Sequence, residues 1–197
     1  HSPGTRSGEW FERAQAVLSR GSTRRSIWVD PYPPYVSHGE GAYVVDLDGY
    51  RYLDVANNLG VLIHGHGLPA VVEAVQRQAA AGSCFALPTR GEVELAELLC
   101  DRVASFERVR FINTGSEAVA LALKMARAVT GRAKIAKLEG IYHGSNEFAD
   151  VSTAPAPKNW GNAPRAVAGA PGTPAGVLDA VVVLAANDPG AAAEVLR

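Results

Sequence analysis

One short segment of the sequence combines residue types that bind a phosphate group. Thr114, Gly115 and Ser116 follow an apolar stretch and directly precede an Ala/Leu-rich segment. A strand that turns at once into a helix leaves several backbone N–H groups unpaired at the positive end of the helix dipole, where an anion is stabilised. Gly115 allows close approach to the backbone, Ser116 adds a hydroxyl donor, and Thr114 has the capping-box spacing to Glu117. We call residues 113–118 the phosphate cup.

An ordinary capped helix start would share this pattern, so a second motif decides between the two interpretations. Tyr142 and His143 lie in the segment Glu139–Gly144, which follows the next apolar strand. In a parallel sheet both segments emerge at the carboxyl ends of neighbouring strands, the edge at which open α/β folds bind ligands. An aromatic ring beside the cup suits a flat heteroaromatic cofactor, and His143 can pack or form a hydrogen bond. Together the motifs predict a planar, phosphorylated cofactor.

Other ligand motifs are missing from the sequence. No Gly-Lys-Ser/Thr of a P-loop and no three-glycine dinucleotide fingerprint follows the strand before the cup, which disfavours ATP and NAD. His64 and His66 flank one glycine without further ligands nearby, so we expect a structural turn and no metal site. The net charge of −1 provides no field that would gather nucleic acid or an anionic membrane surface.

Apolar spacing and turn residues predict the elements that position these motifs. Helices are expected over 8–18, 69–81, 92–104 and 116–129, with a last helix opened by Asp188 and Pro189. Short buried strands are expected at 109–112, 133–138 and 181–185. Asp48-Gly49 predicts a tight two-residue hairpin turn between strands at 42–47 and 50–55, with both turn residues at positive φ. Residues 155–176 hold five prolines and four glycines and are expected to form a long mobile loop.

These elements predict an α/β fold. Strands that alternate with helices indicate a mostly parallel sheet, and the early hairpin is a separate antiparallel element. Three parallel strands are too few to stand alone, so we expect further strands of the sheet beyond Arg197. Residues 1–65 are assigned to a helix-and-hairpin segment and residues 66–197 to the N-terminal portion of a larger domain.

Cysteine usage and hydropathy predict a cytoplasmic protein. Cys84 and Cys100 fit neither a disulfide framework nor a zinc ribbon, and we expect both to be buried thiols in a reducing compartment. No stretch approaches the roughly 20 apolar residues of a membrane span. The polar start of the sequence lacks the apolar core of a secretory signal.

The sequence resembles the class III aminotransferases, and most nearly their glutamate-1-semialdehyde aminomutase branch. The motifs that carry the resemblance run in order along roughly residues 20 to 150. They are Gly41 to Asp54, Leu62 to Pro69, Pro88-Thr89 with Glu92 to Leu98, Phe111 to Ala118, Ala126-Arg127, Thr130 to Arg132 and Tyr142 to Gly144. The resemblance implies a fold-type I, aspartate aminotransferase-like protein that uses pyridoxal 5'-phosphate. It also implies that residues 1–65 belong to the small domain and residues 66–197 to the large cofactor-binding domain.

The resemblance also implies roles for individual residues. In the family, the turn matching Gly115 and Ser116 binds the cofactor phosphate, and the aromatic residue matching Tyr142 stacks on the pyridine ring beside His143. Asn187 resembles the family's asparagine near the cofactor. Arg24 resembles the position that binds a substrate carboxylate, which a guanidinium fork can do with two hydrogen bonds, although Arg25 could equally be this residue. The loop 145–176 corresponds to a gate in the aminomutase branch, and a partner subunit could equally order it.

The expected activity is transfer of an amino group between a small-molecule amino donor and a carbonyl acceptor, in a homodimer. Aminomutation, racemisation and decarboxylation remain alternatives, as do a non-catalytic binding module and a different phosphate ligand. The family places its Schiff-base lysine later in the chain, and none of Lys124, Lys134, Lys137 and Lys158 matches it. We therefore expect the catalytic lysine C-terminal to Arg197, and no catalytic residue within these 197 positions.

Overall fold

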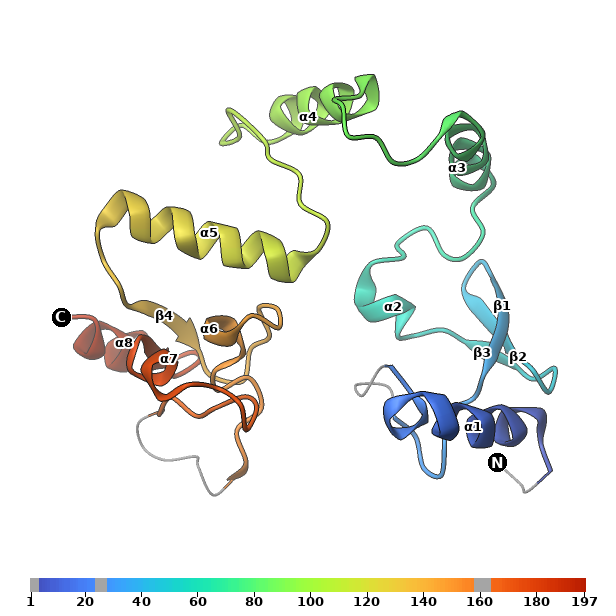
Figure 1. Cartoon of the computed structure of the whole chain (residues 1–197), viewed down its shortest axis with the longest axis horizontal. Helices are drawn as coiled ribbons and strands as arrows, with labels where there is room; N and C mark the ends of the chain where they lie inside the picture. The colour runs from blue at the N-terminus through green and yellow to red at the C-terminus, as the bar shows by residue number, and fades with distance from the viewer. Residues whose placement is uncertain (1–3, 24–27, 158–163) are drawn as a thin grey trace. The chain divides into compact units, whose positions relative to one another are not determined.

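The computed structural model describes residues 4–23, 28–157 and 164–197 (Figure 1). The chain divides into two compact units, His1–Thr89 and Arg90–Arg197. These units are defined by internal contacts, and the functional domain boundary expected after residue 65 stays a prediction.

The first unit contains an antiparallel sheet of three strands in the order β1-β2-β3 (Figure 1). The strands are β1 (Val36–Glu40), β2 (Tyr43–Asp46) and β3 (Arg51–Leu53). The predicted hairpin is confirmed as β2 and β3, which pair Tyr43 with Leu53. We did not predict β1, because its side chains are mostly exposed and show no apolar alternation.

The hairpin turn differs from the predicted two-residue turn. Gly49 has a φ of 86°, whereas Asp48 is not at positive φ, so the expectation for both residues was wrong. The Gly49 amide donates to the Asp46 carbonyl, and the Asp46 amide donates to the Tyr50 carbonyl, which leaves three residues in the loop. The physical reason is the Asp46 side chain, whose Oδ1 accepts hydrogen bonds from the amides of Asp48 (2.9 Å) and Tyr50 (2.8 Å). A three-residue loop with a left-handed glycine is the next most common hairpin connection.

The same hairpin fixes the first helix, α1 (Arg6–Val17). Thr5 is the N-cap and accepts a hydrogen bond from the Gly8 amide. The Asp48 carboxylate accepts two more, from the amides of Arg6 (2.7 Å) and Ser7 (3.1 Å). A carboxylate at a helix N-terminus also interacts favourably with the helix dipole. The Asp-x-Asp-Gly motif therefore closes the hairpin with its first aspartate and caps α1 with its second.

Three shorter or less packed elements complete the first unit. They are the 3-10 turn η1 (Ser19–Gly21), α2 (Asn57–Gly60) and α3 (Pro69–Ala81). In α2, Asn58 and Leu59 have φ values of 47° and 65°, so this element is a left-handed turn within a longer loop. The predicted helix over 69–81 is confirmed, with Pro69 in its first turn.

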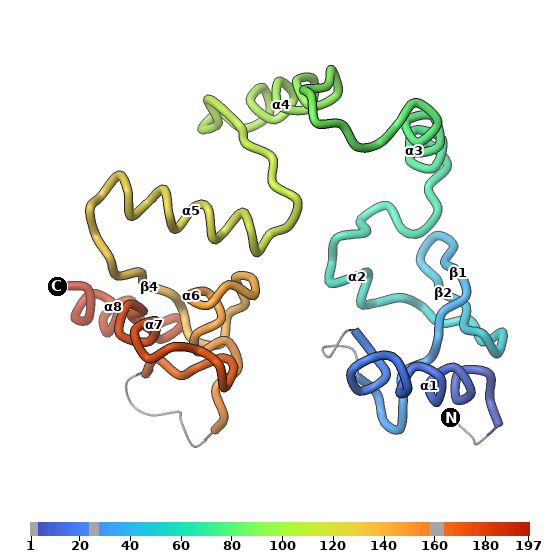
Figure 2. Tube along the Cα trace, viewed as in Figure 1, coloured from blue at the N-terminus to red at the C-terminus, as the bar shows by residue number. Residues whose placement is uncertain are grey.

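The second unit contains a parallel pair of strands, β4 (Ile135–Leu138) and β5 (Val181–Leu184). Its helices are α4 (Arg90–Arg102), α5 (Gly115–Thr130), α6 (Glu147–Asp150), α7 (Ala175–Asp179) and α8 (Pro189–Val195). The trace in Figure 2 runs from α5 through β4 to α6. The core cluster of this unit consists of Val151, Val177, Val181 and Val183. Asp188 caps α8 as predicted, since its Oδ1 accepts from the Ala191 amide.

Two further expectations, one for a strand and one for the cysteines, were not met. Residues 109–112 are not a strand, because no described strand lies beside them to form a hydrogen-bonded ladder. Cys84 is exposed and Cys100 is only half-buried. Cys84 lies in a connection between helices, where the neighbouring Phe85 and Leu87 are also exposed.

Candidate functional site

The phosphate cup forms the first turn of α5. Thr114 is the N-cap residue: its Oγ1 accepts from the Glu117 amide at 3.2 Å and donates to the Glu117 carboxylate at 3.0 Å. This reciprocal contact is a variant of the predicted capping box, with the hydroxyl in place of the N-cap amide as donor. Among the described residues, no hydrogen bond uses the amide of Gly115 or Ser116. Two donors at the positive end of a 16-residue helix are therefore available to an anion.

The space beside Gly115 is open. A Cβ atom built on Gly115 would meet no heavy atom of the chain within 4 Å, and Gly115 is not at positive φ. The backbone geometry of the turn therefore does not require glycine. A ligand that comes close to the backbone would require it, since only glycine leaves this space free.

A hydrogen bond brings the two predicted motifs together. The Ser145 amide donates to Ser116 Oγ at 2.9 Å, and the two hydroxyl groups lie 3.2 Å apart. Gly144 is buried against the cup: a Cβ there would lie 2.8 Å from Ser116 Cα, and its φ of 100° also favours glycine. We call residues 139–145 the Tyr142 turn. Its last two residues contact the first turn of α5.

The side chains of Tyr142 and His143 lie on this turn and are accessible. The Tyr142 side chain is 66% exposed, and His143 is exposed as well. Neither ring takes part in a side-chain hydrogen bond or a ring contact within the described part of the chain. An aromatic face next to free helix N-terminal amides can hold a planar anionic ligand.

Asn187 lies at the same edge of the parallel strand pair. It follows the carboxyl end of β5, whereas the Tyr142 turn follows the carboxyl end of β4, and the two strands are paired in parallel. Asn187 is exposed and has a φ of 59°, a left-handed conformation that asparagine tolerates better than most residues. Open α/β sheets bind ligands at this edge, so the role of Asn187 near the cofactor stays a prediction.

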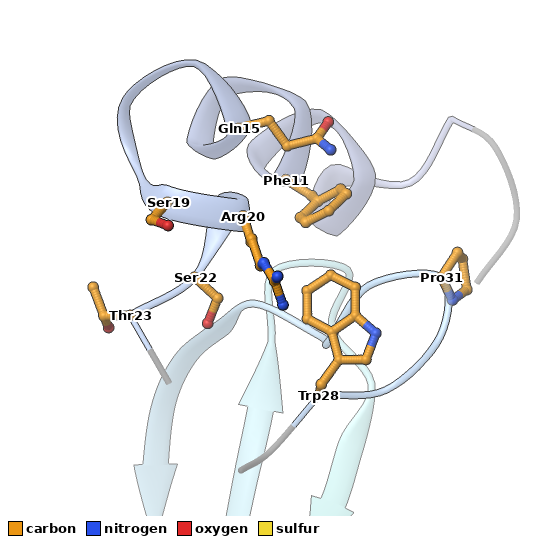
Figure 3. A pocket seen from close by; sticks show the side chains of 8 residues that line it. All are labelled: Phe11, Gln15, Ser19, Arg20, Ser22, Thr23, Trp28 and Pro31. Atoms are coloured by element: carbon orange, nitrogen blue, oxygen red, sulfur yellow. The ribbon is translucent and has the colours of Figure 1, made fainter. Parts of the chain in front are cut away.

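Arg24 and Arg25, the candidates for carboxylate binding, lie outside the described residues. Thr23 and Trp28, which flank the gap, line a hollow of about 1100 Å³ in the first unit (Figure 3). Arg20 and Phe11 also line it, and Phe11 contacts the Trp28 ring edge-on at a centroid distance of 5.7 Å. The residues that line this hollow belong to the first unit, whereas the phosphate cup belongs to the second.

The two histidines of the His64-Gly65-His66 turn differ in environment. His66 Nε2 donates to Asp54 Oδ2 at 2.8 Å, and the His66 backbone pairs with Gly41 in an isolated bridge. His64 is exposed. Within the described residues, no group of three or more His, Cys, Asp or Glu side chains could hold a metal ion. His66 therefore attaches the loop before α3 to the first sheet.

The sequence analysis did not single out two buried polar residues that flank the Tyr142 turn along the chain, Lys137 and Ser152. Lys137 is 7% exposed and Ser152 is 1% exposed. Lys137 could have been found, because it alternates with Ile135 on the buried face of β4. No sequence signal indicated Ser152, since its burial depends on contacts with residues 165–167.

Among the described helices, none is long and apolar enough to cross a bilayer.

The sequence pattern of one protein family, described as aminotransferase class-III, matches residues 26–178. A glutamate-1-semialdehyde 2,1-aminomutase from Natronomonas pharaonis is 39% identical over 190 residues, which cover 95% of this chain and 41% of that protein. The chain thus spans about two-fifths of the length of this relative.

Solved structures are also similar. An omega-transaminase from Sphaerobacter thermophilus superimposes with a TM-score of 0.93 and 49% identity, over 99% of this chain and 45% of that one. A transaminase with PLP bound superimposes with a TM-score of 0.88 and 42% identity, over 97% of this chain and 44% of that one. These likenesses confirm the predicted fold class.

Proposed function

Because the chain belongs to the class-III aminotransferases, we propose that it supplies the phosphate cup and the ring wall of a pyridoxal 5'-phosphate site in an amino-transferring enzyme. When bound, this cofactor accepts electron density from the amino-bearing carbon of the substrate, which is the chemistry that amino transfer requires. The protein's part is to hold the cofactor phosphate and to keep the cofactor ring in one orientation.

The hydrogen bond from the Ser145 amide to Ser116 Oγ carries this proposal. It sets the Tyr142 turn against the first turn of α5, where the amides of Gly115 and Ser116 have no hydrogen-bond partner among the described residues. The cup amides and the α5 dipole bind the phosphate, while Thr114 stiffens the first turn of the helix. Tyr142 stacks on the ring, with His143 beside it and Asn187 at the neighbouring strand end.

The substrates are a small-molecule amino donor and a carbonyl acceptor, at least one of which carries a carboxylate. Arg24 binds that carboxylate through its guanidinium fork, as the resemblance implies. A relative named for aminomutation gives a second candidate, in which the amino group moves within one molecule. Product analysis of the intact protein with a single amino aldehyde, without an added amino donor, distinguishes migration from transfer.

A cofactor titration with two Tyr142 variants tests the proposal. Tyr142→Phe keeps an aromatic face and should bind pyridoxal 5'-phosphate within about twofold of the wild type. Tyr142→Leu removes that face and should weaken binding roughly tenfold, since an aromatic contact contributes about 0.5–1.5 kcal/mol beyond area burial. Equal affinities for the three proteins would rule out Tyr142 as the ring wall. A wild type that does not bind the cofactor would rule out the site.

The proposal extends to the whole protein. We place residues 1–65 in the small domain and residues 66–197 in the large one, and we propose a homodimer located in the cytoplasm. Sedimentation of the intact protein tests the dimer, and a mass close to that of one chain would contradict it. Fractionation of the source cells tests the location.

A further inference from the structure

Lys137 is a buried lysine that the phosphate cup does not use. Its Nζ donates to the carbonyl oxygen of Ala149 at 2.9 Å, to that of Val151, and to Thr153 Oγ1 at 3.1 Å. These three partners account for all three donors of an ammonium group. A single side chain on β4 thus holds three residues of the segment 149–153.

Burial of the Lys137 ammonium charge by itself lowers the stability of the fold. Desolvation lowers the pKa of Lys137, and the nearby Asp150 carboxylate opposes that shift. The three acceptors are neutral, so they compensate only in part for lost hydration. An apolar residue of similar length would suit a buried strand better. The lysine therefore points to a role in holding the segment 149–153 in one place.

Ser152, in the middle of that segment, connects it to the Tyr142 turn. The Ser152 carbonyl accepts from the Gly140 amide at 2.9 Å. Its amide donates to the Val167 carbonyl, and its hydroxyl donates to the Arg165 carbonyl and accepts from the Val167 amide. Ser152 adopts a φ of 51°, which is unfavourable for a non-glycine residue and persists only where the surroundings enforce it.

The Tyr142 turn is consequently attached at three points. The Glu139 amide donates to the Leu184 carbonyl at the end of β5, at 2.9 Å. The Gly140 amide is held by Ser152, and the Ser145 amide by Ser116. The attachment of Glu139 joins the turn to β5, and that of Ser145 joins it to the phosphate cup. The attachment of Gly140, through Ser152, depends on the segment 149–153 that Lys137 holds.

We propose that Lys137 and Ser152 are positioning residues that fix the Tyr142 turn against the phosphate cup. Through Ser152, the same contacts couple residues 165–167 to the turn, so that order in that loop segment and the placement of Tyr142 depend on each other. The consequence for the cofactor ring rests on the proposed function. The coupling itself does not.

Hydrogen exchange of the intact protein without cofactor tests the coupling. In Lys137→Met, peptides covering 139–153 should exchange about tenfold faster, because local opening of this segment becomes easier. Lys134→Met is the matched control, since Lys134 is exposed just before β4, and it should exchange like the wild type. Unchanged exchange at 139–153 in Lys137→Met would overturn the proposal. An equal acceleration in β1–β3 would also overturn it, because it would indicate a general loss of stability.

Ser152→Ala provides a second variant in case Lys137→Met does not fold. It removes the hydroxyl contacts to Arg165 and Val167 but keeps the backbone bond to Gly140. Exchange should rise at 165–167 by at least about fivefold and carry over in part to 139–145. Faster exchange at 165–167 together with unchanged exchange at 139–145 would show that the two segments are not coupled.

Two probes separate the ring wall from the cup. In Lys137→Met the affinity for pyridoxal 5'-phosphate should fall about tenfold, whereas the affinity for inorganic phosphate should stay within about twofold, since the cup is unaltered. An equal loss for both probes would contradict a role in placing Tyr142. If the wild type binds neither probe, the proposed function fails, and the exchange experiment still decides the coupling.

Discussion

We propose two separable roles for Ser116 at the phosphate cup. Its hydroxyl oxygen accepts a hydrogen bond from the Ser145 amide, and its O–H can donate one to a bound phosphate. We expect Ser116→Ala to weaken pyridoxal 5'-phosphate binding by roughly tenfold, because a hydrogen bond to a charged group contributes about 1.5–3 kcal/mol. Ser145→Ala is the control: it keeps the Ser145 amide and removes only the contact between the hydroxyls. Cofactor titration would contradict the assignment if the two variants bound alike.

At the residue level, the sequence predicted the parts of the site that depend on local chain geometry. Thr114 and Ser116 could be placed because an N-cap and its first turn are set by four consecutive residues. The contact between Gly144 and Ser116 was expected only as proximity, from the topology of a parallel sheet. Ser152 could not be predicted, since its partners are residues 140, 165 and 167 and no pattern relates these positions.

At the element level, the first hairpin depends on Asp46, which is 4% exposed. Its carboxylate accepts from the amides of Asp48 and Tyr50 and from the Tyr52 hydroxyl, a bond that raises the pKa of Tyr52. We expect Asp46→Ala to lower the free energy of unfolding by about 2 kcal/mol, measured by urea denaturation of the intact protein. Asp46→Asn keeps one oxygen acceptor and should lose less than half of that. Equal losses would show that the turn amides do not depend on this acceptor.

The pairing of Asp54 with His66 makes the loop before α3 sensitive to acid. The hydrogen bond from His66, followed by that from the Asn57 amide, holds the pKa of Asp54 below its ordinary value of 3.8. A lowered folded-state pKa stabilises the fold above about 3.8, and this contribution disappears as the pH falls through the lowered value. We expect Asp54→Asn to flatten the decrease in Tm between about pH 5 and pH 3. Asp101→Asn, at an exposed position in α4, should leave the profile unchanged. An Asp54→Asn profile as steep as the wild type would contradict this role.

Element prediction succeeded where the element is stabilised by its own residues. α3 and α5 carry their start signals in the sequence, and their observed bounds match the expected ones within one residue. Strands depend on a neighbour. We missed β1 because its mostly exposed side chains show no apolar alternation and its hydrogen bonds are formed with the neighbouring strand β2. Residues 109–112 were assigned as a strand, although no described strand pairs with them. The hairpin turn was wrong by one residue because a side chain, Asp46, competes with the backbone for the turn amides.

At the scale of the whole molecule, several helices have apolar faces that their own unit leaves uncovered. Of the residues in α4 and α5, all of which the structure describes, none is buried. Val93, Leu95 and Leu98 of α4 are each about half exposed, and Val129 of α5 is 86% exposed. An amphipathic helix normally packs its apolar face against another element. The chain spans 41% of the length of one relative and 45% of a similar solved chain, and both of those proteins are more than twice as long.

The expected Schiff-base lysine is the last component of the proposed site to be tested. Among the described lysines, Lys137 is engaged by three oxygen acceptors, and Lys124 lies on α5 beyond the cup. We therefore expect the isolated residues 1–197, mixed with pyridoxal 5'-phosphate and reduced with borohydride, to gain no cofactor mass on any lysine at stoichiometric cofactor. If the proposed function holds, the intact protein should gain one cofactor per chain under the same conditions, because the family resemblance implies a Schiff-base lysine outside residues 1–197. Peptide mass mapping distinguishes the two. A stoichiometric adduct on Lys124, Lys134, Lys137 or Lys158 would place the reacting amine within this chain and contradict the expectation.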